Sequence, residues 1–151
     1  MVTVLIFSLI LLNFFLLLSF PSHANKEYSH NSNEGSYTIW NDGNITYARD
    51  ESTETVEYSS TDAGAVINKL VESLPTYGGK ININAGNYTL SSTIILNKAC
   101  TVEGEGSGRS HPLEGITQLN FGNTTGIKIT SAGVRISHLQ LRGCGETYKA
   151  C

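Results

Sequence analysis

The chain has 151 residues, with 10 Lys and Arg against 13 Asp and Glu, which gives a net charge of −3. The basic residues form no cluster, which excludes the electrostatic footprint of a nucleic-acid-binding protein. The length fits one folded domain behind an N-terminal apolar segment.

Residues 1–24 are predicted to be a signal peptide or a membrane anchor. The stretch 2–20 is almost wholly apolar, and Pro21 ends it. The tripeptide 22–24 (Ser-His-Ala) then places small residues at the −3 and −1 positions of a cleavage site, so the mature chain is expected to begin at Asn25. The apolar run also approaches the ~20 residues that span a bilayer, so membrane association through residues 2–20 is the alternative. Both interpretations predict a secreted or cell-surface protein.

Residues 25–36 are polar and lack apolar periodicity, which predicts a flexible linker. Residues 37–61 are expected to form a small β-meander. Three strand-like segments occur there, at 37–40, 45–48 and 55–58. Between the first two, the Asp42-Gly43 dipeptide predicts a tight hairpin turn, since glycine adopts the positive φ that such turns need.

A helix is predicted over 62–75, with Thr61 or Asp62 as its N-cap. Its apolar residues fall on one face, at the spacing of an amphipathic helix: Val66, Ile67, Leu70, Val71 and Leu74. Pro75 and the glycines that follow end it. One apolar face must therefore be buried against another element.

From Lys80 to the last residue, short runs alternate apolar and polar side chains, and Gly or Asn stands where the chain must turn. Such a pattern is typical of an all-β sandwich, barrel or solenoid. The corner residues, and apolar motifs that recur roughly every 20 residues, favour a parallel β-helix in which stacked coils bury one another's faces. Residues 80–151 are therefore interpreted as its first coils, with the helix capping the open end.

Several of these motifs together resemble the N-terminal portion of the pectate-lyase superfamily. They are Gly78-Gly79-Lys80-Ile81, Ala85-Gly86-Asn87-Tyr88, Val102-Glu103-Gly104-Glu105-Gly106 and Thr117-Gln118-Leu119, after the Asp62-Ala63 start of the helix. The lead-in from Tyr37 is similar to that of secreted prokaryotic and archaeal surface β-helix proteins. The resemblance implies a right-handed, single-stranded, pectin-lyase-like parallel β-helix that acts on or binds polysaccharide. It also implies Ca²⁺ as a cofactor, although the residues themselves indicate none.

The sequence offers few catalytic residues for a polysaccharide lyase or glycoside hydrolase. No Asp follows Asp62, whereas calcium sites and hydrolytic sites need several carboxylates. The catalytic candidates are Glu103, Glu105 and Arg142, for each of which a solvated corner or outer face is the competing interpretation. We therefore expect catalytic residues to lie in later coils, and this chain to be an inactive, truncated part of a longer protein.

Candidate substrate-binding residues are Arg109 and His111 in the loop 107–115, and Trp40, which with Tyr47 suits stacking on a sugar ring. The competing interpretation packs the two aromatic rings between the meander and the first coil. His138 is expected to face outward.

Three Asn-x-Thr triplets predict glycosylation at Asn44, Asn87 and Asn123. Cys144 and Cys151 are close enough in sequence to form a disulfide, and Cys100 is expected to be a small buried core residue. No Cys or His spacing predicts a metal site.

The expected partner is a polysaccharide or cell-envelope glycan, with no nucleic acid. The open end of the stack predicts oligomer formation, because unpaired strand edges associate. The alternatives to an enzyme's N-terminal part are a non-enzymatic cell-surface or adhesion module and a degenerate fragment.

Overall fold

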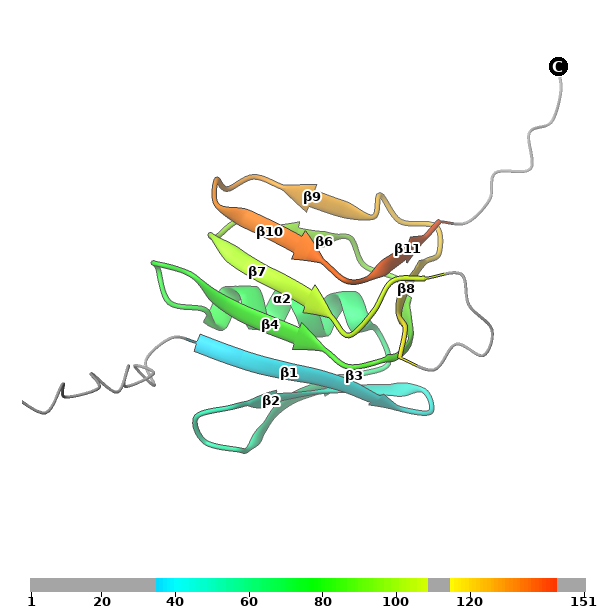
Figure 1. The fold of residues 1–151 in the computed structure, drawn as a ribbon, viewed down its shortest axis with the longest axis horizontal. Coiled ribbons are helices and arrows are strands. Elements are labelled where there is room, and N and C mark those ends of the chain that lie inside the picture. Colours follow the sequence, from blue (N-terminus) through cyan, green and yellow to red (C-terminus); the bar gives the residue numbers. More distant parts are fainter. Residues whose placement is uncertain (1–34, 109–114, 144–151) are drawn as a thin grey trace, which may run out of the picture. The chain divides into compact units, whose positions relative to one another are not determined.

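The hairpin predicted around Asp42-Gly43 is formed by β1 (Gly35–Asp42) and β2 (Ile45–Asp50), which pair antiparallel. The computed structural model describes residues 35–108 and 115–143 (Figure 1). Asp42 is in register with Ile45, so the turn consists of Gly43 and Asn44, and Gly43 has a φ of 63°. A glycine with positive φ at the first central position is what a type II′ hairpin turn requires.

β3 (Val56–Ser60) pairs antiparallel with β2 and completes the three strands of the meander. The meander is continuous with the strands that follow, because β1 pairs in parallel with β4 (Gly79–Ile83) and brings Tyr37 into register with Ile81. The three strands of the region 37–61 therefore extend the first parallel sheet.

The helix expected over 62–75 is α2 (Ala63–Ser73), with Asp62 as its N-cap. Its apolar face is buried, with side chains at most 2 % exposed. The residues of this face are Val66, Ile67, Leu70, Val71 and Leu74. The helix packs against β3, β5 (Gly86–Leu90) and β6 (Ile94–Leu96), so it covers one end of the strand stack.

The remaining strands repeat one path through three sheets (Figure 1). The first circuit consists of β4, β5 and β6. The second circuit consists of β7 (Cys100–Gly104), β8 (Thr117–Phe121) and β9 (Ile127–Ile129). β10 (Val134–Ser137) and β11 (Gln140–Arg142) begin the third. Each strand pairs in parallel with its counterpart in the neighbouring circuit, so the protein is mostly β with parallel sheets.

The spacing between circuits is less regular than the predicted 20 residues. Ile81 is in register with Val102, which matches that spacing, but Val102 is in register with Ile136. The second circuit is longer because the connection from β7 to β8 contains the segment 105–116. A constant period therefore describes only part of the stack.

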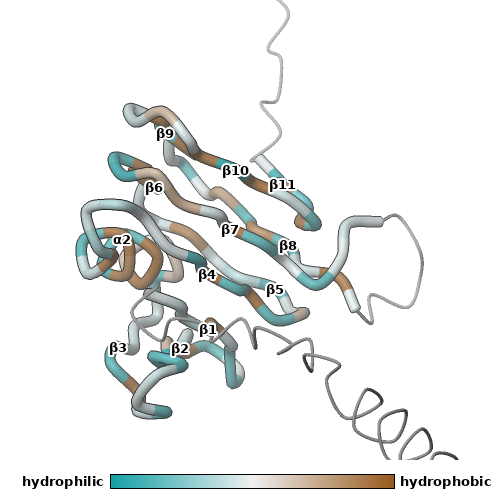
Figure 2. Tube along the Cα trace, turned by 60° about the vertical axis from the view of Figure 1, so that its left-hand side comes forward, coloured by the Kyte–Doolittle hydropathy of each residue, from teal (hydrophilic) through white to brown (hydrophobic). Residues whose placement is uncertain are grey.

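Side chains alternate between the two faces of each strand, as Figure 2 shows in the alternating hydropathy along the tube. The inward-facing residues form one apolar core with the helix face. Tyr88, Ile39, Ile81, Ile83, Leu90 and Leu96 are among its largest buried side chains. The Tyr88 hydroxyl donates to the Asn84 carbonyl at 2.9 Å, which satisfies its polar end within the core.

β3 and β10 are the edges of the six-stranded sheet, and β9 and β11 are edges of the two smaller sheets. Ile129 and Leu141, on β9 and β11, are 53 % and 52 % exposed. Within residues 35–108 and 115–143, no helix is long and apolar enough to span a bilayer. The predicted signal or anchor segment 1–24 lies outside the described residues.

Candidate functional site

The outer face of the six-stranded sheet carries most of the polar side chains that the strand register brings together. Strand alternation turns Tyr37, Ile39, Ile81 and Val102 into the core, so their sequence neighbours face outward. One outward row contains Ser36, Lys80, Thr101 and Arg135, and the next contains Arg49, Thr38, Asn82, Glu103 and Ser137. The outer face is therefore a band of hydroxyl, amide and charged groups.

Glu103 is the centre of the charged groups on this face. Its Oε2 lies 2.7 Å from Lys80 Nζ on β4, and its Oε1 lies 3.1 Å from His138 Nδ1. The Lys80 hydrogen bond and charge, with a smaller contribution from His138, hold the pKa of the Glu103 carboxyl below its ordinary value. The three side chains are 30–59 % exposed, so the group is accessible to a ligand.

His138 reaches Glu103 because of its position at a corner of the chain. It follows β10 directly and has a φ of 54°, a left-handed conformation that non-glycine residues rarely adopt. The backbone carbonyl of His138 lies against Gly104, where a Cβ would overlap it. Glycine at 104 thus allows the third circuit to approach the second and brings His138 beside Glu103. The prediction that His138 faces outward is confirmed.

Trp40 and Tyr47 are a register pair on β1 and β2, and their rings stack with centroids 5.5 Å apart and planes 17° apart. They flank the inward-facing Ile39 and Ala48, so they lie on the outer face of the sheet. The two rings pack on each other, and both are half-buried.

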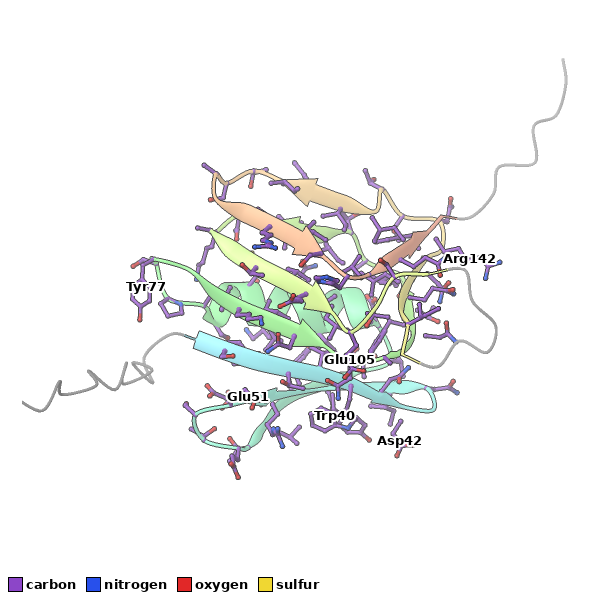
Figure 3. The ribbon with its side chains drawn as sticks, in the orientation of Figure 1. Trp40, Asp42, Glu51, Tyr77, Glu105 and Arg142 are labelled. Atoms are coloured by element: carbon purple, nitrogen blue, oxygen red, sulfur yellow. The ribbon has the colours of Figure 1, made fainter. Side chains whose placement is uncertain are left out.

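The other catalytic candidates do not join Glu103. Glu105 is exposed, and its backbone N–H donates to Thr117 Oγ1 at 3.0 Å. Arg142 is exposed at the end of β11, in register with Asn120, and points away from the sheet (Figure 3). The candidates Arg109 and His111 lie outside the described residues.

The glycosylation candidates Asn44, Asn87 and Asn123 are all exposed. Cys100 is a free cysteine and only 4 % exposed, so the prediction of a buried core residue is confirmed. The predicted pair Cys144 and Cys151 lies outside the described residues.

Sequence reasoning selected Glu103 but missed its partners Lys80 and His138. The sequence did contain a signal for Lys80. When Gly79-Lys80-Ile81 is aligned with Cys100-Thr101-Val102, Asn82 lies beside Glu103. Lys80, two residues before Asn82, then lies on the same face of the sheet as Glu103. No comparable signal existed for His138, because its position depends on the longer second circuit.

The Glu103 group does not fit the calcium ion that the family resemblance implies. Calcium takes six to eight oxygen ligands, usually including several carboxylates. Both Glu103 oxygens contact basic side chains, and in residues 35–108 and 115–143 no three His, Cys, Asp or Glu side chains gather in a possible metal site. The group is suited instead to binding a polar or charged ligand through Lys80 and His138.

Neither a known protein family nor a curated protein nor a solved structure matches this chain. The resemblance to the pectate-lyase superfamily therefore stays a prediction that rests on the quoted motifs alone.

Proposed function

We propose that this chain is the N-terminal part of an exported, right-handed parallel β-helix protein that binds acidic polysaccharide on the outer face of its six-stranded sheet. Support for the β-helix comes from the repeated path of the strands, in which each circuit stacks in parallel register on the one before. Support for export comes from the apolar segment 2–20.

The observation that carries the binding proposal is the outward row in which Lys80 and Arg135 flank Thr101. Two basic side chains in one row, with the strand of Thr101 between them, match carboxylates repeated along an acidic chain. Lys80 is paired with Glu103, but its ammonium has three N–H donors and its side chain is 46 % exposed. It can therefore hold the ion pair and also bind a sugar carboxylate.

The Trp40–Tyr47 stack lies at the hairpin end of the same face and offers a flat apolar surface to a sugar ring. The basic row and the aromatic pair belong to one continuous sheet, because β1 joins β2 to β4. The aromatic pair lies four residues along β1 from Ser36 of the basic row, so an extended polysaccharide that runs diagonally across the strands would contact both.

The proposal is for binding and assigns no catalytic step to these residues. A glycoside hydrolase needs two carboxyl groups roughly 5–10 Å apart. Both carboxylate oxygens of Glu103 are instead engaged by basic side chains, Lys80 and His138.

Affinity electrophoresis of the full chain through gels that contain polygalacturonate tests the proposal. The double variant Lys80→Gln, Arg135→Gln removes the two basic groups of the row, and we expect it to weaken retardation about threefold to tenfold. The control is Lys69→Gln, since Lys69 is an exposed helix residue that pairs with Glu72 away from this face. Equal retardation of the wild type and the double variant, or none by the wild type, would refute acidic polysaccharide binding at this face.

A non-enzymatic surface or adhesion module is the second candidate, and the exposed apolar side chains on the edge strands favour it. Ile129 and Leu141 would be covered if β9 and β11 stacked against further strands, from another copy or from further chain. Sedimentation velocity of the full chain and of Leu141→Lys tests self-association. Only concentration-dependent association that Leu141→Lys abolishes would support assembly through this end.

A further inference from the structure

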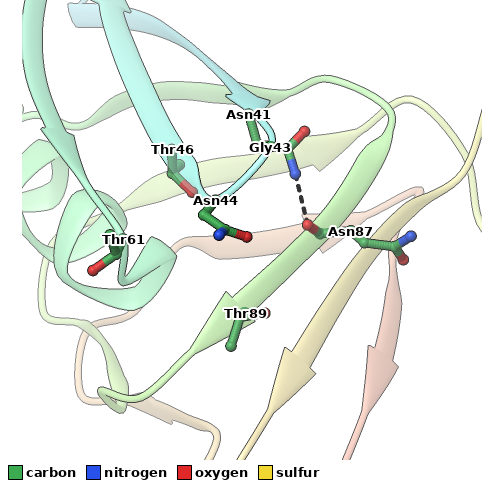
Figure 4. Close-up of a pocket in the computed structure, with 7 residues that line it drawn as sticks. All are labelled: Asn41, Gly43, Asn44, Thr46, Thr61, Asn87 and Thr89. Carbon is green, nitrogen blue, oxygen red and sulfur yellow. Dashed lines mark hydrogen bonds between the residues drawn. The ribbon is translucent and has the colours of Figure 1, made fainter.

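A pocket of about 290 Å³ lies between the tip of the β1–β2 hairpin and strand β5 (Figure 4). It is lined by Asn41, Gly43, Asn44, Thr46, Thr61, Asn87 and Thr89. The volume is at the lower end of the range for small-molecule sites, which suits a ligand of one or two sugar units. The proposed polysaccharide face does not use this pocket, because the Trp40–Tyr47 pair lies on the opposite face of the hairpin from Asn41 and Thr46.

The chemistry of the lining is uniform, because its side chains are all amides or hydroxyls. Amides and hydroxyls each donate and accept hydrogen bonds, as the hydroxyl groups of a sugar do. No lining residue carries a charge, so nothing in the pocket would offset the desolvation of a sugar carboxylate. The lining therefore favours a neutral sugar over an acidic one.

Two Asn-x-Thr triplets supply four of the lining residues. Asn44 stands in the hairpin turn and Thr46 in β2, whereas Asn87 and Thr89 are both in β5. Residues i and i+2 of a strand face the same side, so Asn87 and Thr89 lie on one face of β5. The sequence indicated these triplets as separate glycosylation sites, whereas the fold brings both to one pocket.

The shape of the pocket is fixed by a direct link between its two walls. Asn41 Nδ2 donates to the Asn87 carbonyl at 2.6 Å, which ties the hairpin to β5 (Figure 4). On the side of β5 that faces away from the hairpin, Gln118 of β8 is in register with Asn87. Gln118 is only 6 % exposed and donates to Asn120 Oδ1 at 2.6 Å, so the pocket ends at β5.

We infer that this pocket binds one neutral sugar unit through the amide of Asn44 and the hydroxyl of Thr89, both of which are exposed side chains, whereas the Asn87 amide is directed away from Asn44 (Figure 4). The ligand is held by hydrogen bonds and is not attached covalently. The inference does not depend on the proposed function, because the two sites use different residues and ligands of different charge.

Saturation-transfer difference NMR tests the inference on the full chain, produced in a host without N-glycosylation. The probes are glucose, galactose, mannose and N-acetylglucosamine, with galacturonate as the acidic comparison. We expect saturation transfer to at least one neutral sugar and a clearly weaker signal for galacturonate. Thr89→Val removes one hydroxyl at nearly constant shape, and we expect it to weaken binding about threefold to tenfold.

The matched control is Thr101→Val, the same chemical change on the outer face of the six-stranded sheet. Circular dichroism of each variant confirms that the fold is intact, and Asn44→Ala provides a second pocket variant on an exposed turn. Equal binding by the wild type, Thr89→Val and Asn44→Ala, or no saturation transfer to any neutral sugar, would overturn the inference. A glycan attached to Asn44 or Asn87, found by peptide mass spectrometry of the protein from its natural producer, would also overturn it.

Discussion

The backbone N–H of Ile95 on β6 donates to the side-chain Oδ1 of Asn68 on α2 at 2.8 Å. The same amide donates from Nδ2 to the Thr93 carbonyl at 2.9 Å. One side chain thus makes both of the hydrogen bonds that a neighbouring strand would make, on the side of β6 that β9 does not cover. The helix therefore closes a sheet edge as well as burying the core beneath it.

Replacement of Asn68 by Leu keeps a side chain of similar size but removes both hydrogen bonds. We expect Asn68→Leu to lower the free energy of unfolding by about 1–3 kcal/mol, since two backbone groups lose their partners. Urea denaturation followed by circular dichroism measures it. The neighbouring Lys69→Ala is the control and should cost at most about 1 kcal/mol, because Lys69 makes only an exposed ion pair with Glu72. Equal costs for the two variants would contradict the edge-closing role of Asn68.

Asp62 links the start of the helix to the segment after β5, and this link predicts a pH dependence of stability. Its carboxylate accepts hydrogen bonds from the N–H groups of Gly64 and Ser91, each at 3.0 Å, and from the Ser92 hydroxyl. Burial raises the pKa of Asp62, but these hydrogen bonds outweigh burial and the net pKa is lowered. A lowered pKa in the folded state contributes stability above the unfolded pKa, which is lost as the pH falls through the folded value.

We expect Asp62→Ala to lower the free energy of unfolding by about 1–2 kcal/mol at pH 7. The difference from the wild type should shrink below pH ~4, where the unfolded carboxyl is protonated. Urea denaturation at pH 7 and pH 3 measures both values, with the exposed hairpin residue in Asp42→Ala as control. A difference that stays constant between the two pH values would show that the ionised carboxylate is not what stabilises the cap.

The alternating residues of β4 and the apolar face of α2 were predictable from the sequence because both patterns are local. Ile81 and Ile83 alternate with polar neighbours, and the helix face recurs at helical spacing. Pairing between circuits is not local, since it depends on the length of each connection. Ile81 is paired with Val102, but Val102 is paired with Ile136, so the spacing between paired residues is uneven. For this reason the sequence did not indicate which outward-facing residues of neighbouring circuits lie side by side.

The residues of the candidate site were likewise only partly predictable, because their contacts also depend on the lengths of the connections. Glu103 was recognised from its glycine-flanked motif, whereas its contact with His138 requires the length of the 105–116 connection and the left-handed corner at His138. The pocket at Asn44 and Asn87 was missed for a related reason. The two triplets are far apart in sequence, and only the packing of the hairpin against β5 joins them.

Thr117 holds the long 105–116 connection to the first circuit. Its buried hydroxyl contacts the Ile83 carbonyl at 2.9 Å and accepts from the Glu105 N–H at 3.0 Å. We expect Thr117→Val to lower the free energy of unfolding by about 1–3 kcal/mol, because the buried Ile83 carbonyl and the part-buried Glu105 N–H each lose a hydrogen-bond partner at nearly unchanged volume. Thermal unfolding followed by circular dichroism measures it.

The matched control for Thr117→Val is Thr125→Val, which makes the same change at an exposed position before β9. It should alter the unfolding free energy by less than about 0.5 kcal/mol. If Thr117→Val were as stable as this control, the hydroxyl would not hold the connection in place.

Cys100 is buried at the start of β7, and its burial predicts that its thiol reacts slowly with alkylating reagents. Burial raises the pKa of the Cys100 thiol, and the thiolate is the reactive form, so both access and chemistry oppose alkylation. In the full chain carrying Cys144→Ser and Cys151→Ser, we expect a maleimide to label native Cys100 at least about tenfold more slowly than the protein unfolded in urea. The control places a thiol one residue further on, as Thr101→Cys with Cys100→Ser, where the side chain faces outward and should react readily in the folded protein. Equal native labelling rates at positions 100 and 101 would mean that the first sheet opens on the time scale of the reaction, which contradicts a core sealed by the stacked circuits.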